Sequence, residues 1–215
     1  MIISRGRSYI FVHIPKTGGT ALALALEGRA MRDDIMLGDT PKAMKRRRKL
    51  SGVQSRGRLW KHSTLADIDG LIEVDEIADM LCFTLVRNPW DRMVSYYHWL
   101  REQSFDHPAV RLAQCEDFSG FLNHPQTQTV IRANPYAAYM RDTTGAERAG
   151  LYIRLEHFDT DAGPLWSHLG FRLDLPMANR SERAPDYRGY YSDADRRLVG
   201  ALCAEDVARF GYEFD

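Results

Sequence analysis

The chain has 215 residues, and its 29 lysines and arginines equal its 29 aspartates and glutamates, so the formal net charge is zero. Hydrophobic residues make up 44% of the sequence, a globular composition that excludes a wholly disordered chain. No apolar run approaches the roughly 20 residues of a membrane helix, so we expect neither a membrane span nor a signal peptide. The length predicts a single domain over residues 1–215.

Residues 9–14 form a short apolar and β-branched run, which predicts a buried strand. Residues 15–19 interrupt this run. A helix rich in alanine and leucine is expected next, over residues 21–31, with Thr20 as its N-terminal cap. The order strand, glycine-containing loop, helix is therefore predicted for the start of the chain.

Residues 33–60 form a basic excursion without clear periodicity, which we interpret as irregular or partly helical, and mobile in part. Between Thr40 and Ala66 the sequence holds nine lysines and arginines and no acidic residue. Such a segment indicates either an anionic partner or a solvated loop. If it lines an acceptor cleft, neutralising Arg46, Arg47 and Arg48 together should raise the KM of the acceptor.

The rest of the chain alternates further strands with helices. A second buried strand is predicted over residues 81–86 and a third over 151–155, with helices in 62–80, 90–101, 164–169 and 192–210. Ser192 is expected to cap the last helix and Gly211 to end it. Short buried strands separated by helices predict a three-layer α/β fold with a central, mostly parallel β-sheet flanked by helices. Three scattered cysteines favour a reducing cytoplasm over a disulfide framework.

The sequence HIPKTGGT, residues 13–20, joins the first predicted strand to its helix. Gly18 and Gly19 allow the backbone to approach an oxyanion, and the helix N-terminus offers free N–H groups. Lys16 adds a positive charge, while Thr17 and Thr20 add hydroxyl donors. Because Lys16 precedes the glycines and no G-K-[ST] exists in the chain, we expect a P-loop-like phosphate cradle without its usual Mg²⁺ ligand.

The sequence LVRNPWDRMVSYYHW, residues 85–99, places Arg87 directly after the second strand. Ligands of open α/β sheets bind at the carboxyl ends of strands, and arginine suits phosphate. Ser95 lies two turns into the next helix, where its hydroxyl could meet the same phosphate. The alternative is that Arg87 pairs with Asp91 and that Ser95 is a surface hydroxyl.

Both motifs resemble those of the sulfotransferases that take sulfate from 3′-phosphoadenosine 5′-phosphosulfate (PAPS), in particular the carbohydrate-sulfotransferase branch with its small bacterial members. HIPKTGGT is similar to the family's 5′-phosphosulfate loop, and VRNPWDRMVSYY to its 3′-phosphate motif. The resemblance implies that residues 16–20, Arg87 and Ser95 bind the donor. It also extends to residues 153–159 and 175–215, where Ser181 and Arg183 are candidates for nucleotide binding.

The resemblance implies transfer of a sulfuryl group to a hydroxyl of a carbohydrate or small metabolite, an anionic glycan among the candidates. The product is adenosine 3′,5′-bisphosphate (PAP), and no metal is required. Lys16 would stabilise charge on the leaving 5′-phosphate, and His62 is our candidate for the base, with His13 and Glu156 as alternatives. For Glu156 we favour instead a buried pairing with Arg154. We expect PAPS as donor, a cytoplasmic location, and no nucleic-acid partner.

Two other functions stay open from the residues alone. A nucleotide-dependent kinase is disfavoured because G-K-[ST] and an obvious strand-end aspartate for Mg²⁺ are missing. An anion- or nucleic-acid-binding protein that uses the basic residues 42–61 would bind polyanions with a steep salt dependence and independently of Lys16.

Overall fold

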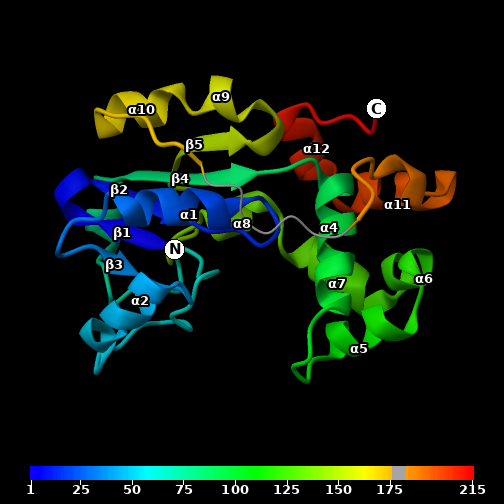
Figure 1. Ribbon diagram of the computed structural model, residues 1–215, viewed down its shortest axis with the longest axis horizontal. Coiled ribbons are helices and arrows are strands. Elements are labelled where there is room, and N and C mark those ends of the chain that lie inside the picture. Colours follow the sequence, from blue (N-terminus) through cyan, green and yellow to red (C-terminus); the bar gives the residue numbers. More distant parts are fainter. Residues whose placement is uncertain (176–182) are drawn as a thin grey trace. The chain divides into compact units, whose positions relative to one another are not determined.

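The computed structural model describes residues 1–175 and 183–215 (Figure 1). Its described residues fall into two compact units, the first within Met1–Val86 and Tyr136–Asn179 and the second within Arg87–Pro135 and Arg180–Asp215. Each unit is described by itself. The single domain expected across residues 1–215 stays a prediction.

The first unit contains a five-stranded sheet in the order β3-β1-β2-β4-β5. Its strands are β1 (Ile2–Ser4), β2 (Tyr9–Val12), β3 (Ile35–Met36), β4 (Leu81–Val86) and β5 (Ala149–Arg154). β4 is parallel to both β2 and β5, while β1 is antiparallel to its neighbours β2 and β3. Four strands therefore run in one direction and one opposes them, which confirms the mostly parallel sheet.

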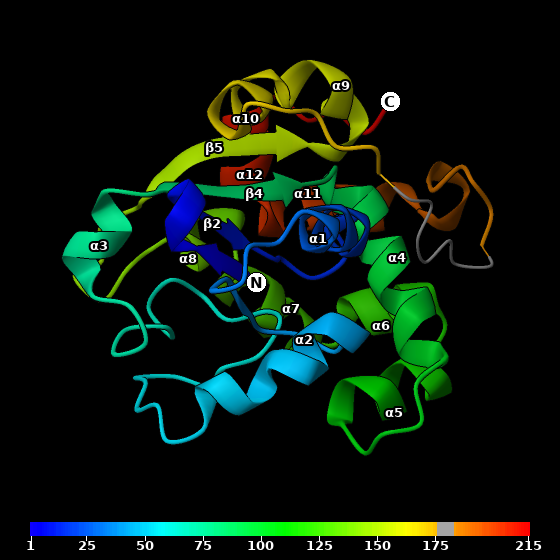
Figure 2. The same cartoon turned by 60° about the vertical axis from the view of Figure 1, so that its left-hand side comes forward.

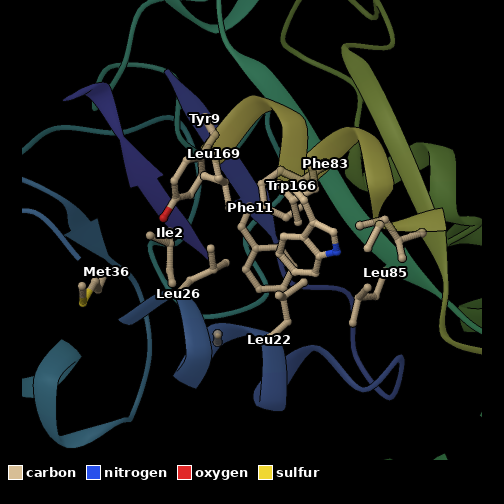
Figure 3. Packing of buried hydrophobic residues seen from close by; sticks show 14 of the residues in the cluster. Ile2, Tyr9, Phe11, Leu22, Leu26, Met36, Phe83, Leu85, Trp166 and Leu169 are labelled. Atoms are coloured by element: carbon tan, nitrogen blue, oxygen red, sulfur yellow. The ribbon is translucent and has the colours of Figure 1, made fainter. Parts of the chain in front are cut away.

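One face of the sheet carries the main apolar core of the first unit (Figure 3). Phe11 of β2 lies beside Phe83 of β4 in the parallel register, with their ring centroids 5.4 Å apart. Two helices pack against these rings: α1 (Gly19–Gly28) contributes Leu22 and Leu26, and α10 (Gly163–Leu169) contributes Trp166. The alanine- and leucine-rich run that predicted α1 supplies the side chains that this helix buries.

The opposite face is buried as well. Strand side chains alternate between the faces, so Ile10 and Cys82 point away from Phe11 and Phe83, and both are 0% exposed. The Cys82 thiol donates to the carbonyl of Ile77 in α3 (Val74–Ala78) at 3.7 Å. Because a sheet buried on both faces reads as continuous apolar runs, LCFTLV showed no alternation in the sequence.

The basic excursion contains more regular structure than we expected. It includes β3, then α2 (Pro41–Arg46) and a 3₁₀ turn over Arg47–Leu50. Figure 2 shows α2 and, further along the chain, α3 as separate helices. Thr40 caps α2 through its hydroxyl, which accepts from the Ala43 N–H at 3.2 Å. The helix predicted somewhere in residues 62–80 is confined to α3.

The remaining helices of the first unit are α8 (Tyr136–Tyr139) and α9 (Phe158–Asp161). In the second unit, the helices are α4 (Pro89–Arg101), α5 (Pro108–Cys115), α6 (Phe118–Asn123), α7 (Pro125–Ala133), α11 (Asp193–Leu202) and α12 (Ala204–Phe210). The apolar stripe of α4 is buried as its spacing predicts, with Trp90 and Tyr97 only 6% and 4% exposed. These rings therefore belong to the core.

The ends of two helices differ from the predictions. α1 begins at Gly19 with Gly18 as its cap residue, so Thr20 lies inside the helix and does not cap it. The final helix is divided at Cys203 into α11 and α12. Ser192 caps α11 and Gly211, at a φ of 64°, ends α12, as predicted.

Candidate functional site

The loop between β2 and α1 is held in an unusual backbone conformation. Lys16 has a φ of 67° and Gly18 a φ of 81°, both in the left-handed region. Side chains rarely adopt this conformation outside glycine, so the position of Lys16 is a strained one. The Thr17 hydroxyl donates to the Ile14 carbonyl at 2.9 Å and fixes the turn from inside, because Thr17 is 0% exposed.

Both glycines of the loop are required by close neighbours. A Cβ on Gly18 would lie 2.8 Å from Leu155 Cδ1, and one on Gly19 would lie 2.3 Å from the His13 ring. Leu155 follows β5 directly, so the loop packs closely at the carboxyl ends of two parallel strands. The glycines therefore bring the start of α1 against the sheet.

The start of α1 is suited to an anion. No side chain caps its N-terminus at Gly18, so the first N–H groups stand at the positive end of the helix dipole without a side-chain acceptor. Lys16 and Thr20 are half-buried beside this turn. Thr17 differs from our expectation in one respect: its hydroxyl serves the turn, which leaves its backbone as the part suited to a ligand.

His62, our candidate for the base, lies beside the same loop. Its Nδ1 is 2.7 Å from the carbonyl oxygen of His13. A carbonyl oxygen only accepts, so Nδ1 carries the proton in the neutral ring and Nε2 carries the lone pair. Burial lowers the pKa of His62 to about 4, against the opposing effect of this hydrogen bond and helped by the charge of Lys61. His62 is therefore neutral at pH 7, with Nε2 able to accept a proton.

The alternative bases are less suited to that role. His13 is buried between Gly19 and the His62 ring, whose centroid is 4.8 Å away, and burial holds its pKa well below the usual value. Glu156 is exposed, so the burial that we expected for it is wrong. Arg154 pairs with Asp161, with Nε 2.7 Å from the carboxylate.

In the second unit, two arginines converge on one carboxylate. Arg87 donates through Nε and Nη2 to Asp91 Oδ2 at 2.7 and 2.5 Å, and Arg183 Nη2 donates to Asp91 Oδ1 at 2.6 Å. The Arg87–Asp91 pair is the alternative that the sequence left open. The side chains of Arg87 and Arg183 are only 14% and 10% exposed. Two half-buried guanidinium groups therefore share the carboxylate of Asp91.

Ser95 belongs to the same side of the second unit's first helix. It lies four residues after Asp91 on α4, so the two share one helix face, and it is buried. Arg183 Nη1 is buried without a hydrogen-bond partner in the described structure, which marks a place for an acceptor. Ser181, our other candidate, lies outside the described residues.

Sequence reasoning missed two features of this cluster. It treated Asp91 only as a competitor for Arg87, whereas Asp91 also holds Arg183 from 92 residues further along the chain. It did not propose His98 as a site residue, yet the Nε2 of His98 is buried without a partner among the described residues. The helical spacing of Asp91, Ser95 and His98 is the signal that could have found them.

Among the described residues, no group of three histidine, cysteine, aspartate or glutamate side chains is arranged to hold a metal ion. Within the same residues, none of the helices is both long and apolar enough to cross a membrane.

The chain is similar in fold to a solved structure, the mouse sulfotransferase SULT7A1 complexed with PAP. The TM-score is 0.53 at 17% sequence identity, over 95% of this chain and 85% of that chain. No family model matches the sequence, and no curated protein matches it either. The structural match shows that the α/β sheet and its helices form the fold of a sulfotransferase.

Proposed function

We propose that the protein is a PAPS-dependent sulfotransferase that transfers a sulfuryl group to an acceptor hydroxyl. The observation that carries the proposal is the loop of residues 13–20, which opens α1 with two glycines that admit no side chain and with a strained lysine. The sulfotransferase fold and the resemblance of both motifs support it. The carbohydrate-sulfotransferase branch is part of the proposal.

The residues present fit the two charged ends of this donor. The uncapped start of α1, with Lys16 and the backbone of residues 17–20, is assigned to the 5′-phosphosulfate. We assign the 3′-phosphate to Arg87, Ser95 and Arg183. The Nη1 of Arg183, which has no hydrogen-bond partner in the described structure, could donate to a phosphate oxygen. From the resemblance we also assign Ser181. The product PAP would occupy the same residues.

Bound PAPS would supply an electron-poor sulfuryl group, whose transfer between two oxygens depends on positioning and charge stabilisation. Nε2 of His62 takes the proton of the acceptor hydroxyl, since Nδ1 is committed to the His13 carbonyl. Lys16 stabilises the negative charge that develops on the leaving phosphate. No step requires a metal ion.

We propose a carbohydrate or small metabolite as the acceptor, and an anionic one because basic residues precede His62 in the chain. Arg58 and Trp60 lie next to His62: the Trp60 ring is 4.9 Å from the imidazole, and the Arg58 guanidinium is 5.2 Å from the Trp60 ring. Three free cysteines accord with the proposed cytoplasmic location.

Calorimetric titration tests the donor assignment. PAP should bind the wild type, and Arg87→Ala should lose that binding, because the guanidinium supplies charge-assisted hydrogen bonds to phosphate. Arg188→Ala is the matched control, since Arg188 pairs with Asp186 on the surface. Binding of ATP with Mg²⁺ alone would support a kinase. Binding of neither nucleotide would leave the basic residues 42–61 as the leading anion site.

A further inference from the structure

We propose that His98 is a further ligand of the donor's 3′-phosphate and that it contributes to the selection of a 3′-phosphorylated nucleotide. The inference rests on the proposed function. It assigns a direct hydrogen bond from Nε2 to a phosphate oxygen to a histidine that neither motif assignment uses.

The first observation is the position of His98 on α4. Asp91, Ser95 and His98 follow one another at spacings of four and three residues, so they form a single stripe along the helix. The stripe begins at the carboxylate that holds Arg87 and Arg183. A ligand bound by these arginines and by Ser95 would therefore extend toward His98.

The second observation is a pair of buried nitrogen atoms without partners. Nε2 of His98 and Nη1 of Arg183 are both buried and lack a hydrogen-bond partner in the described structure. Buried polar atoms are almost always paired in folded proteins, so each of these exceptions requires an explanation. The charge of Arg183 acts on His98, which places the two side chains in one electrostatic environment.

The chemistry of the two atoms defines the missing ligand. A guanidinium nitrogen can only donate, and a neutral imidazole donates from Nε2 in one of its two tautomers. Burial, together with the charges of Arg101 and Arg183, lowers the pKa of His98, so the ring is neutral at pH 7. A phosphate offers several acceptor oxygens and a negative charge, which suits the Nη1 of Arg183 and the donating tautomer of His98.

The orientation of the His98 ring is fixed by its neighbours. The rings of Tyr97 and Tyr190 pack edge-on against it, with centroids 5.5 and 5.1 Å away. A ring held on two sides loses little conformational freedom when it binds a ligand, which favours a binding role. Phenylalanine has a similar shape and keeps this packing, and therefore removes the donor alone.

The test is a calorimetric titration of the wild type, His98→Phe and His98→Gln with PAP and with adenosine 5′-phosphate, which lacks the 3′-phosphate. We expect His98→Phe to weaken PAP binding by roughly tenfold or more and to leave adenosine 5′-phosphate binding unchanged, as for loss of a hydrogen bond to a charged group. His98→Gln should recover part of the loss, because its amide still donates. His157→Gln is the control, since His157 is exposed.

Three results would overturn the inference. Equal losses for both nucleotides would show that His98 acts through the structure, and unchanged PAP binding in His98→Phe would show that it makes no contact with the 3′-phosphate. A wild-type protein that binds no PAP would overturn the donor assignment and this inference together. In the first two cases the wild type still binds PAP, so the proposed function survives.

Discussion

Gly19 is the residue where the loop meets His13, because the ring of His13 fills the space in which a side chain of residue 19 would lie. We expect Gly19→Ala to lower the free energy of unfolding by about 1–3 kcal/mol, since the new methyl group must displace a buried ring. Gly28→Ala, at the other end of the same helix, has no atom within 4 Å of its new Cβ and should be neutral or slightly stabilising. Urea unfolding of both variants measures the difference, and equal midpoints would contradict the packing argument.

Lys16 holds a left-handed backbone that side chains rarely adopt, and we attribute this strain to the proposed site. Lys16→Ala should lower kcat by roughly 10²-fold or more through loss of charge stabilisation in the transition state. Steady-state kinetics with an identified acceptor measures this effect. Lys45→Ala removes an exposed lysine of the same charge and should keep the wild-type rate. A near-normal rate in Lys16→Ala would remove the proposed role.

His62 links catalysis and stability to pH with a definite sign. Its pKa falls from 6.5 to about 4 on folding, so below pH 6.5 the unfolded chain binds more protons than the folded one. Stability is therefore lost as the pH falls from 6.5 to 4, by up to about 3 kcal/mol from this residue. Chemical denaturation across this range should show a shallower decline for His62→Gln than for the wild type. An unchanged slope would contradict the shift.

In the proposed mechanism, the same pKa sets the acid limit of the reaction. A base that stays neutral down to pH 4 should keep kcat/KM from falling near pH 6.5, where an ordinary histidine becomes protonated. A pH–rate profile with its acid limb at about 6.5 would point to a solvent-exposed base instead. This residue was predicted from the resemblance alone, because nothing in the sequence shows that His62 bonds to a carbonyl 49 residues earlier.

At the scale of elements, α2 is anchored by basic side chains that bind backbone rather than ligand. Arg46 donates to the carbonyls of Met31 and Asp34 at 2.7 and 3.1 Å, and Lys42 donates to the Glu27 carbonyl at the end of α1. Cations near the last carbonyls of a helix satisfy them and oppose its dipole. Part of the basic segment therefore has a structural role.

These contacts distinguish Arg46 from Arg47 and Arg48, which the sequence analysis treated as one group. Arg46→Ala should cost about 1 kcal/mol of stability through its lost hydrogen bonds, whereas Arg48→Ala should cost nothing, because Arg48 is exposed. Thermal denaturation distinguishes the two. If the segment binds the acceptor, Arg47→Ala with Arg48→Ala should raise the acceptor's KM without a loss of stability. A stable Arg46→Ala protein would contradict the anchoring.

Long periodic elements were predictable and short ones were not. The stripe of α4 and the caps Ser192 and Gly211 were found because each depends on local spacing and chemistry. β1 and β3 have three and two residues, too few to show a period; β1 pairs with the edge of β2, and β3 pairs in turn with β1. The cap of α1 was wrong because the left-handed turn at Gly18, which is set by packing against Leu155, moved the helix start.

At the scale of the whole molecule, this chain shares its fold with a protein whose sequence is largely different. The match to the mouse sulfotransferase holds over 95% of this chain at 17% identity. The order of strands and helices in this chain was predicted from hydrophobic patterning. The two motifs follow β2 and β4, which pair in parallel. Long-range contacts, such as Asp91 with Arg183, could not be predicted because no local pattern encodes them.

PAP should stabilise the whole protein if the donor assignment is right. At a concentration one hundred times its Kd, a ligand that binds only the folded state adds about 2.7 kcal/mol, which corresponds to a rise in Tm of roughly 5–10 °C for a chain of this size. Differential scanning fluorimetry should show this rise for the wild type and its absence for Arg87→Ala. A rise of the same size in Arg87→Ala would place PAP elsewhere.

The carboxylate of Asp91 also competes with any anion that approaches the two arginines. Each guanidinium already has a partner of full negative charge at 2.5–2.7 Å, so an incoming ion must interact with the guanidinium groups more favourably than Asp91 does. Chloride and bicarbonate, with a single charge, gain little from the exchange, whereas a phosphate monoester brings up to two charges and several oxygens. We therefore expect the cluster to keep the arginines ordered and to favour a phosphate monoester over chloride or bicarbonate.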